Sequence, residues 1–596
     1  MNAIQLPAVT HEFSTLMQSR GQTVSHGDLE FVSLISAAWQ SERTNPNPIV
    51  FAAECGFGKS TLLELFLRHK TASDPYFGAI IVKQKRDEVE ALSVAINRNL
   101  TEDGREQVRY RRAFAIRGYD PLQMTYRSYR KQFERQAYYP VVIMTAEMLA
   151  RQSSMRLLDR FSSFYDGDRQ RRPRRLLIID ERPVITRNHS VSVEDVNRLI
   201  VDVRAIGLRK YNGKEANYFR EFLEYAQRLR HEIESCSVAA RIEPVDFEYT
   251  LPEELRKDWG DDYEGDNFDM LGTFESAIRF GGAVSFRRGG VPVVSVSQRI
   301  YYEWTQYNSF ILDATAKTDP YYASDKFDVI EAPTPHLYRN VYFNVCPSEN
   351  LSRSFFEAHP QSFDEVAAMV KEIAAKQRKT MVVFYKEHLS RLEELLAEEI
   401  ECGAVLTKHF DSGRATNEYK DCDAAIFLGW LLKGDTYYPQ VASAIYSELL
   451  PLDHDINISG IRYSDARVES FKTGELVTER IQDVHRIRPR SSTYPINVYL
   501  FHRDGEIIRK IIESFPGSIR REFTPLRRLS GKVTHADNLI GYFQKMESGQ
   551  RTKSKEIYES LGISARQFSR LQEDPRVVEA MRQYRVIKDR TFYSKL

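Results

Sequence analysis

The chain has 596 residues, of which 42% are hydrophobic and 28% are charged. This length exceeds what one hydrophobic core can serve, so several domains are expected, and the composition is typical of folded rather than disordered protein. The formal net charge of +1 excludes a strong whole-molecule field, so any contact with nucleic acid must come from local basic patches.

Residues 1–21 lack a basic segment followed by an apolar core, so we expect no signal peptide. No run of about 18 apolar residues is long enough to span a bilayer, so no membrane partner is expected. The cysteines lack C-x-x-C spacing, which argues against a disulfide framework and a zinc site and favours a cytoplasmic protein. They are Cys55, Cys236, Cys346, Cys402 and Cys422.

Residues 1–45 are expected to form an N-terminal helical segment, and a lobe of alternating strands and helices is expected over 46–330. Near-continuous apolar runs alternate there with helical patterns, as in a parallel sheet that is covered on both faces. The runs are residues 48–54, 78–84, 113–118, 139–145, 175–181 and 309–315. This alternation predicts a doubly wound α/β domain.

The alternation stops between about 187 and 305, where the sequence is mostly helical and polar and then acidic. This stretch ends in a predicted β-hairpin that turns at residues 288–290. Because 309–315 is predicted to be a further strand of the first sheet, we interpret 187–305 as an insertion in the first lobe. A second α/β series is expected over 331–515, with strands at 341–345, 380–385, 403–410, 424–430 and 496–502.

Residues 516–596 differ in character from both α/β series. A short amphipathic helix is expected to end at Gly562, and Ser564 with Gln567 forms a capping box for the next helix. Two short strands are expected around residues 588–589. Helix, turn, helix and hairpin is the outline of a winged helix-turn-helix.

The candidate nucleic-acid contacts of this domain are Arg566, Gln567 and Arg570, which lie about one helical turn apart as on a recognition helix. A domain that docks protein is the alternative. Three basic stretches could also track phosphates, although such stretches are more often solvated faces. They are residues 109–112, 169–175 and 527–532.

The junction at residues 49–64 resembles a phosphate-binding loop, with Ala53 where the G-x-x-x-x-G-K-[ST] pattern has its first glycine. An apolar strand precedes the loop and a helical pattern follows it, as phosphate binding at a helix N-terminus requires. Alanine fits the first position if its φ angle is negative. The candidate nucleotide-binding residues are Ala53, Cys55, Gly56, Phe57, Gly58, Lys59, Ser60 and Thr61.

Asp180 and Glu181 follow a buried apolar run, and a phosphate-binding loop needs such carboxylates. Asp180 with Ser60 would hold Mg²⁺, and Glu181 would polarise the attacking water. An acidic pair at the end of a strand is otherwise often an ordinary turn. Its place about 120 residues after the loop favours the catalytic interpretation.

At this point the sequence resembles the superfamily 2 helicases and translocases, the DEAD/DEAH-like group. Members often begin the loop with alanine, as in A-x-x-G-x-G-K-[ST], and "AECGFGKS" at 53–60 is similar. "DERP" at 180–183 occupies the D-E-x-[HD] position, with Pro183 in place of the last residue. That residue normally links the ATP state to the rest of the motor, so the resemblance leaves this link in doubt.

Later segments resemble further motifs of the family in the expected order. "LDATAK" at 312–317 resembles the S-A-T element with Asp313 in place of serine, and 413–429 resembles motif V, in which Thr416 and Asn417 would contact nucleic acid. "QDVHRIRPR" at 482–490 is similar to motif VI. It has Gln482, His485 and Arg486 in place, while Pro489 replaces the second arginine, so Arg488 or Arg490 must substitute.

The resemblance spans about residues 45 to 505 and implies two RecA-like P-loop lobes. Together with the patterns of the insertion and the tail, the expected fold is α/β, with two such lobes, a helical insertion in the first and a C-terminal winged helix-turn-helix. It also implies that the lobes sandwich ATP and Mg²⁺, with arginines of the second lobe neutralising the transferring phosphoryl. Some relatives carry an iron–sulfur cluster on four cysteines between the phosphate-binding loop and the acidic pair. The region between Cys55 and Asp180 contains no cysteine, so no such cluster is expected here.

The resemblance therefore implies an ATP-dependent helicase that moves along or unwinds nucleic acid, with DNA favoured over RNA because of the winged-helix interpretation. One alternative is a duplex-DNA translocase or remodeller that never separates strands. A second is a DNA-binding regulator in which the ATPase acts as a switch. A protein partner could dock on the insertion or on the C-terminal domain.

Overall fold

The computed structural model divides the chain into two compact units, Met1–Thr334 with Lys433–Glu475 and Pro335–Leu432 with Leu476–Leu596. Each unit is described by itself. The residues that the structure describes are 6–41, 46–98, 112–120, 122–154, 156–210, 214–244, 273–274, 276–277, 281–286, 290–323, 326–410, 412, 418–457, 460–526, 529 and 533–596.

The first unit is built on a seven-stranded sheet in which every neighbouring pair of strands is parallel. Six of its strands were predicted from apolar runs, and all six are confirmed. The seventh, β13, is an edge strand whose residues are mostly exposed, so it has no apolar run. In sheet order the strands are β13 (Asp328–Glu331), β1 (Ile49–Ala52), β12 (Asn308–Leu312), β7 (Leu176–Asp180), β2 (Ala79–Lys83), β4 (Val141–Thr145) and β3 (Ala113–Ala115).

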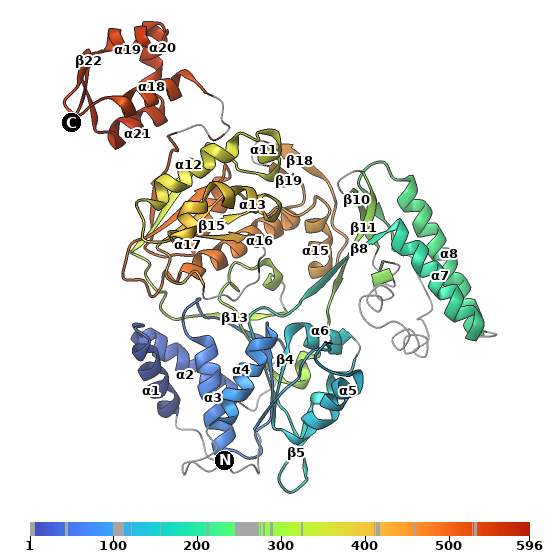
Figure 1. The fold of residues 1–596 in the computed structure, drawn as a ribbon. Coiled ribbons are helices and arrows are strands. Elements are labelled where there is room, and N and C mark those ends of the chain that lie inside the picture. The colour runs from blue at the N-terminus through green and yellow to red at the C-terminus, as the bar shows by residue number, and fades with distance from the viewer. Residues whose placement is uncertain are drawn as a thin grey trace. The chain divides into compact units, whose positions relative to one another are not determined.

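Alternate residues of these strands enter two separate cores, because successive side chains of a strand point to opposite faces. Phe51 and Ile81 pack in the core with the N-terminal helices, whereas Val50 and Ile80 pack in the core on the other face. Figure 1 shows helices on the blue and cyan part of this unit. They are α1 (Leu6–Ser19), α2 (His26–Gln40), α3 (Lys59–Ser73), α4 (Arg86–Asn97), α5 (Tyr126–Arg135) and α6 (Ala146–Ser154).

The expected insertion contains two long helices, α7 (Val193–Lys210) and α8 (Lys214–Ser235), which lie side by side (Figure 1). It also contains a four-stranded antiparallel sheet that the helical pattern did not predict. The predicted hairpin corresponds to two of these strands, and residues 288 and 289 of its predicted turn lie outside the described residues. In sheet order the strands are β8 (Thr186–Ser192), β11 (Pro292–Arg299), β10 (Gly282–Phe286) and β9 (Ala240–Ile242).

Residues Lys433–Glu475 belong to the first unit, although they lie inside the range expected for the second α/β series. They contain α15 (Tyr437–Tyr446) and the hairpin of β18 (His454–Asn457) and β19 (Gly460–Tyr463). Apolar side chains of this segment, including Val441 of α15, are buried in the same core as Val50. The segment ends within α16 (Ala466–Val484), whose last residues belong to the second unit.

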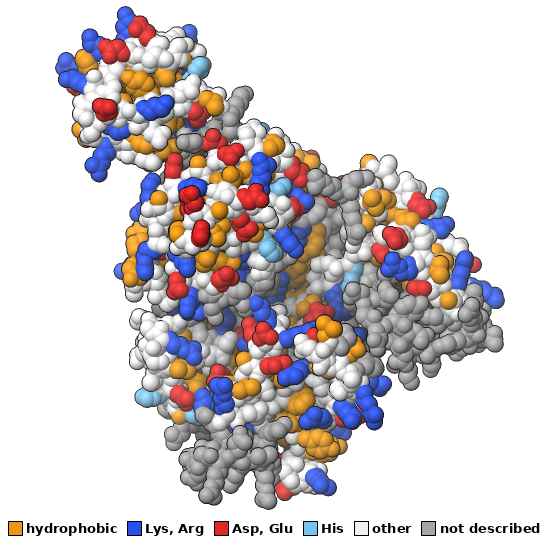
Figure 2. All heavy atoms as spheres, in the orientation of Figure 1, with side chains coloured by type: hydrophobic (Ala, Val, Ile, Leu, Met, Phe, Trp, Pro, Cys, Tyr) orange, Lys and Arg blue, Asp and Glu red, His pale blue; other side chains and the backbone are white. Residues whose placement is uncertain are grey.

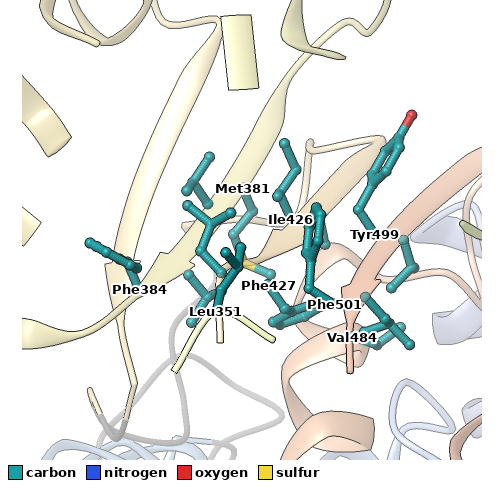
Figure 3. Close-up of a cluster of buried hydrophobic side chains, with 14 of the residues drawn as sticks. Leu351, Met381, Phe384, Ile426, Phe427, Val484, Tyr499 and Phe501 are labelled. Atoms are coloured by element: carbon teal, nitrogen blue, oxygen red, sulfur yellow. The ribbon is translucent and has the colours of Figure 1, made fainter. Parts of the chain in front are cut away.

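The second unit contains a six-stranded sheet that is again entirely parallel. Its core includes Met381, Ile426 and Phe501 from three different strands (Figure 3). All five predicted strands are confirmed, and the sixth, β21, is an exposed edge strand. In sheet order they are β16 (Val405–His409), β15 (Thr380–Phe384), β17 (Ala424–Phe427), β20 (Ile496–Phe501), β14 (Val341–Cys346) and β21 (Ile519–Glu522).

Helices follow the strands of this sheet, as expected for parallel connections. The helices are α11 (Arg353–Ala358), α12 (Ser362–Ala374), α13 (Lys386–Leu395), α14 (Ala397–Glu401), the end of α16 and α17 (Gly505–Glu513). Both sheets therefore agree with two RecA-like lobes. No helix within the described part of the chain is long and apolar enough to cross a membrane.

The C-terminal part has four helices and a three-stranded antiparallel sheet around its own core. The capping box of Ser564 and Gln567 is confirmed, but the hairpin turns at residues 590–591 rather than at 588–589. The winged helix-turn-helix stays a prediction. The elements are α18 (His535–Lys545), β22 (Arg551–Lys553), α19 (Ser554–Ser560), α20 (Ala565–Leu571), α21 (Pro575–Gln583), β23 (Val586–Asp589) and β24 (Phe592–Lys595).

Candidate nucleotide-binding site

The predicted phosphate-binding loop connects β1 to α3, so the strand and the helix expected around it are both present. Gly56 and Gly58 have φ angles of 83° and 98°, a region that glycine enters without steric penalty. Ala53 is fully buried and is not among the residues with positive φ. Alanine therefore fits the first position of the loop, as expected.

The helix α3 begins directly after Gly58, and no side chain caps its N-terminus. Free backbone N–H groups at such an end attract anions. The ammonium of Lys59 donates to the carbonyl oxygens of Ala53 at 2.8 Å and Glu54 at 3.4 Å, so the lysine folds back over the loop. Burial raises the pKa of the Cys55 thiol, which therefore stays protonated at neutral pH.

Ser60 and Asp180, the two predicted metal ligands, lie in contact. The Ser60 hydroxyl donates to Oδ2 of Asp180 at 2.7 Å, although 120 residues separate them. The contact arises because Asp180 ends β7 at the same sheet edge at which β1 leads into the loop. Lys83, the last residue of β2, donates to the same Asp180 oxygen and to Ser60 Oγ at 3.3 Å.

Lys83 and Asp180 are both buried, and each is charged because of the other. Burial alone would raise the pKa of Asp180, but the charge of Lys83 and the hydrogen bonds from Lys83 and Ser60 hold it below its ordinary value. Burial alone would lower the pKa of Lys83, but Asp180 raises it above its ordinary value. Sequence patterns did not single out Lys83.

Glu181 follows directly with a φ angle of 74°, which is rare for a residue other than glycine. Its backbone N–H donates to the carbonyl oxygen of Leu312 at 3.0 Å, which ties the end of β7 to the end of β12. Strained backbone of this kind often occurs at functional sites. The candidate base is thus held beside Asp180 by the ends of two neighbouring strands.

Asp313, which replaces the serine of the S-A-T element, stabilises its own turn. Its Oδ1 accepts from the backbone N–H and the hydroxyl of Thr315, both at 2.9 Å. Its Oδ2 accepts from the buried hydroxyl of Tyr322 at 3.0 Å. A serine could not accept three such bonds, which gives the substitution a structural reason.

Arg182 is a further residue that sequence reasoning missed. Its guanidinium donates to Oδ2 of Asp319 at 2.8 Å and lies 4.0 Å from the ring centroid of Tyr321. The Tyr321 hydroxyl lies 3.3 Å from that of Tyr437, which in turn donates to Glu475 at 3.0 Å. Polar contacts therefore run from the residue after Glu181 to the helix α16.

The N-terminal helices cover the phosphate-binding loop. Phe57 packs against Phe13 of α1 and Phe31 of α2, with ring centroids 5.9 and 5.7 Å apart. Arg20, just after α1, donates to the hydroxyl of Thr61 at 2.8 Å. These contacts join residues far apart in sequence, so no local motif could have revealed them.

The motif VI-like residues lie at the end of α16 and in the turn after it, within the second unit. Arg486 donates to Asp483 at 3.0 Å, and its side chain is 8% exposed. Arg488 is exposed and has a φ angle of 50°, whereas Arg490 is half-buried. Gln482 is also half-buried. The structure brings these residues into one short segment of the second unit.

Arg480 is another buried cation of α16, two residues before Gln482. Its guanidinium lies 4.1 and 4.2 Å from the ring centroids of Phe427 and Trp430 and donates to the Gly429 carbonyl at 3.0 Å. Burial lowers its pKa to about 10. We interpret Arg480 as a structural residue that orients this end of the helix.

The candidate nucleic-acid residues have different outcomes. Thr416 and Asn417 lie outside the described residues, as does most of each of the stretches 109–112 and 527–532. Arg566, Gln567 and Arg570 are exposed on α20, although Gln567 Oε1 accepts from Ser564 N–H and hydroxyl in the capping box.

The stretch 169–175 is partly structural, because Arg174 is buried and Arg172 pairs with Asp166, whereas its other arginines are exposed. It lies in and beside the strand β6 (Arg171–Pro173), which pairs with β5 (Ser163–Tyr165). Arg174 is fully buried and donates to five backbone carbonyls. Figure 2 also shows basic side chains gathered where α5 lies. The exposed basic residues of α5 are Arg127, Arg130, Lys131 and Arg135.

The donor set fits ATP with Mg²⁺. Phosphates suit a loop of glycines with positive φ, the uncapped N-terminus of α3 and Lys59. A hard cation suits the adjacent oxygens of Ser60 and Asp180. Elsewhere in the described ranges, no three histidine, cysteine or acidic side chains gather as a metal site would require.

No family model and no curated protein matches the chain. Among solved structures, the helicase Lhr of Mycobacterium smegmatis bound to ssDNA and AMP-PNP is similar at a TM-score of 0.37 and 10% identity, over 99% of this chain and 60% of that one. The DUF1998 helicase MrfA bound to DNA and AMPPNP has a TM-score of 0.34 and 11% identity, over 98% and 61%.

Mss116p bound to ssRNA and AMP-PNP has a TM-score of 0.33 and 12% identity, over 95% of this chain and 89% of that one. This chain thus spans about 60% of the Lhr and MrfA chains. Likenesses at these identities and TM-scores are too low to transfer a function to this chain. A function must therefore be argued from the site itself.

Proposed function

We propose that the chain is an ATPase of the superfamily 2 kind that couples ATP hydrolysis to movement along nucleic acid, with DNA the favoured track. The observation that carries the ATPase is the contact of Ser60 with Asp180, at the sheet edge that also bears the phosphate-binding loop and Glu181. A chance Gly-Lys-Ser would have no reason to meet a buried aspartate 120 residues later that a glutamate directly follows.

Each side chain has a role in this proposal. Lys59 would turn from the loop carbonyls to the β- and γ-phosphates, and the N-terminus of α3 would hold the phosphates. Ser60 and Asp180 would hold Mg²⁺, which neutralises charge on the phosphates when bound. Glu181 would accept the proton of the attacking water.

The second unit would supply a cation to the hydrolysis reaction. Of its candidates, Arg486 is tied to Asp483, and Arg488 is the exposed one. We therefore assign the role of arginine finger to Arg488, with Gln482 and Arg490 as the other candidates for contact with the nucleotide. An arginine in this role typically accelerates hydrolysis by about 10³- to 10⁵-fold.

Nucleic acid would be held by exposed basic side chains. Candidates are the basic side chains of α5 and, on α20, Arg566 and Arg570. Such contacts are electrostatic, so affinity should fall steeply with added salt. The preference for DNA rests on the winged-helix interpretation alone.

The test is ATP hydrolysis measured without polymer and with single-stranded DNA, duplex DNA or RNA. We expect stimulation by one polymer, with both basal and stimulated rates lost in Lys59→Ala and Glu181→Gln. Hydrolysis that no polymer changes would overturn the motor and favour the nucleotide-controlled switch. A strand-displacement assay beside a translocation assay then separates a helicase from a duplex translocase.

A further inference from the structure

Lys83 is a buried lysine whose ammonium lies where the two proposed metal ligands meet. Its side chain is 7% exposed and that of Asp180 is 5% exposed. The ammonium contacts Asp180 Oδ2 and Ser60 Oγ, and the Ser60 hydroxyl donates to the same Oδ2. One cation of the protein therefore touches both of the side chains that would hold Mg²⁺.

The parallel sheet dictates this position. The strands β2 and β7 are neighbours, and Val82 pairs with Ile179. The next residues, Lys83 and Asp180, therefore leave the two strands side by side. The other lysine of the site, Lys59, donates to loop carbonyls instead.

A buried carboxylate requires a compensating cation, since its charge is otherwise poorly solvated. Lys83 supplies that cation to Asp180 when no metal is bound. An ammonium has no lone pair and cannot itself ligate a metal, and two cations at one carboxylate oxygen repel each other. A metal that binds Ser60 Oγ and Asp180 Oδ2 would therefore compete with Lys83 for the same two oxygens.

We propose that Lys83 is an internal counter-ion that competes with Mg²⁺ for Asp180, so that the metal binds this site only when the lysine leaves the carboxylate. The inference rests on the proposed function in taking Ser60 and Asp180 as metal ligands. It implies that the wild-type site has little affinity for Mg²⁺ alone. Removal of Lys83 takes away the cation that contacts Asp180 directly and so leaves room for a metal in its place.

The test replaces Lys83 by methionine, which keeps the length of the side chain and removes its charge. Thermal unfolding of the full chain is followed without nucleotide, in EDTA and in MgCl₂ up to about 10 mM, at constant ionic strength. A ligand that binds the folded state raises the unfolding midpoint by mass action, so the midpoint reports Mg²⁺ binding. We expect no response to Mg²⁺ in the wild type and a rising midpoint in Lys83→Met. The response should disappear in Lys83→Met with Asp180→Asn.

The matched control is Lys70→Met. It removes the lysine of another Lys–Asp pair, with Asp74 at 3.0 Å, at the opposite end of α3 from the loop. This variant should remain as indifferent to Mg²⁺ as the wild type. If Lys83→Met does not fold in EDTA, Lys83→Gln keeps a hydrogen-bond donor for Asp180 without the charge.

A second readout is the binding of a fluorescent ADP analogue with Mg²⁺ and with EDTA. We expect the ratio of the two affinities to be at least about tenfold larger in the Lys83 variants than in the wild type. Unchanged metal responses in both Lys83 variants would overturn the inference. A metal response without nucleotide binding would support the inference and contradict the proposed function, so the two can fail separately.

Discussion

The ion pair between Arg182 and Asp319 allows a quantitative test of how the first unit is held together beside the acidic pair. Arg182 Nη1 lies 2.8 Å from Asp319 Oδ2, and the side chains are 15% and 0% exposed. Burial alone would lower the pKa of Arg182, but the attraction of Asp319 raises it above its ordinary value, so Arg182 stays charged. Removing either side chain's charge takes from the other its ion-pair partner in a buried place.

Breaking such a pair by removing one partner typically destabilises a protein by about 3–5 kcal/mol. We expect a loss in this range for Arg182→Met and for Asp319→Asn. Asp319 Oδ1 accepts a hydrogen bond from the Tyr321 N–H at 3.1 Å, and the amide oxygen of asparagine can still accept it. The double variant removes both charges together. It should be more stable than the sum of the two losses implies, by about 2 kcal/mol or more.

The assay is thermal unfolding of the full chain, with hydrogen exchange at the amides of β7 and β12 to identify the transition of the first unit, because a chain with two units need not unfold in one step. At roughly 2 °C per kcal/mol for a unit of this size, each single variant should lower that midpoint by about 6 °C or more.

The control is Arg117→Met, which breaks an exposed pair with Glu90 and should shift the midpoint by less than about 2 °C. Single variants of Arg182 and Asp319 that behave like this control would refute the reasoning. Losses that simply add in the double variant would also refute it.

Four further predictions concern the site and the motif VI-like turn. Gly58→Ala should weaken binding of a fluorescent ATP analogue at least about tenfold. A Cβ at position 58 would lie 2.7 Å from Met17, and the φ angle of Gly58 is 98°. The control is Gly21→Ala, which adds a Cβ in open space. Glu181→Gly should raise the thermal midpoint by about 2 °C and abolish hydrolysis. Glycine adopts the left-handed φ angle of this position without the steric penalty that glutamate has there. An unchanged midpoint would contradict that strain. Arg488→Ala should lower kcat at least about 100-fold with an unchanged midpoint, and an unchanged kcat would remove it as the finger. Burial alone would raise the pKa of Asp483, but neighbouring cations lower it, so its stabilisation is present above about pH 4 and is lost as the pH falls through the folded-state pKa. A midpoint difference from Asp483→Asn that does not begin to shrink as the pH falls below about 4 would contradict this.

The inner strands of both sheets could be predicted because they are largely buried on both faces and are therefore near-continuous apolar runs. Of the four edge strands, β13 and β21 have mostly exposed residues and no such signal. Of the four-stranded sheet of the insertion, the hairpin of β10 and β11 was predicted, whereas β8 and β9 were missed for a related reason. Only Thr186 and Val191 of β8 are buried and most of its side chains are polar, so its pattern is weak.

The grouping of Lys433–Glu475 with the first unit had no local signal either. Nearly every residue of the helix α15 is buried, and nothing in its sequence specifies which sheet it covers. Only the three-dimensional contacts of Val441 and its neighbours with the core around Val50 decide that. The elements of this segment and their place in the fold were therefore both missed.

In the candidate site, the loop and the pairing of Ser60 with Asp180 were predicted, whereas two cations whose partners lie on other elements were not. Glycines, lysine and serine of the loop share one turn, so their spacing is visible in the sequence. Lys83 and Arg182 have partners 97 and 137 residues away. Their roles follow only from the neighbouring places of β2, β7 and β12 in the sheet.

A charge argument could nevertheless have found these two cations. The carboxyl ends of β7 and β12 and the turn after β12 carry three buried acids, Asp180, Asp313 and Asp319. Asp313 is satisfied by neutral donors, whereas Asp180 and Asp319 each need a cation. Lysine at the end of an apolar strand and arginine directly after an acidic pair are otherwise unfavourable placements. Both placements make sense as counter-ions, so a basic residue at a buried strand end is itself evidence that a carboxylate lies on the neighbouring strand.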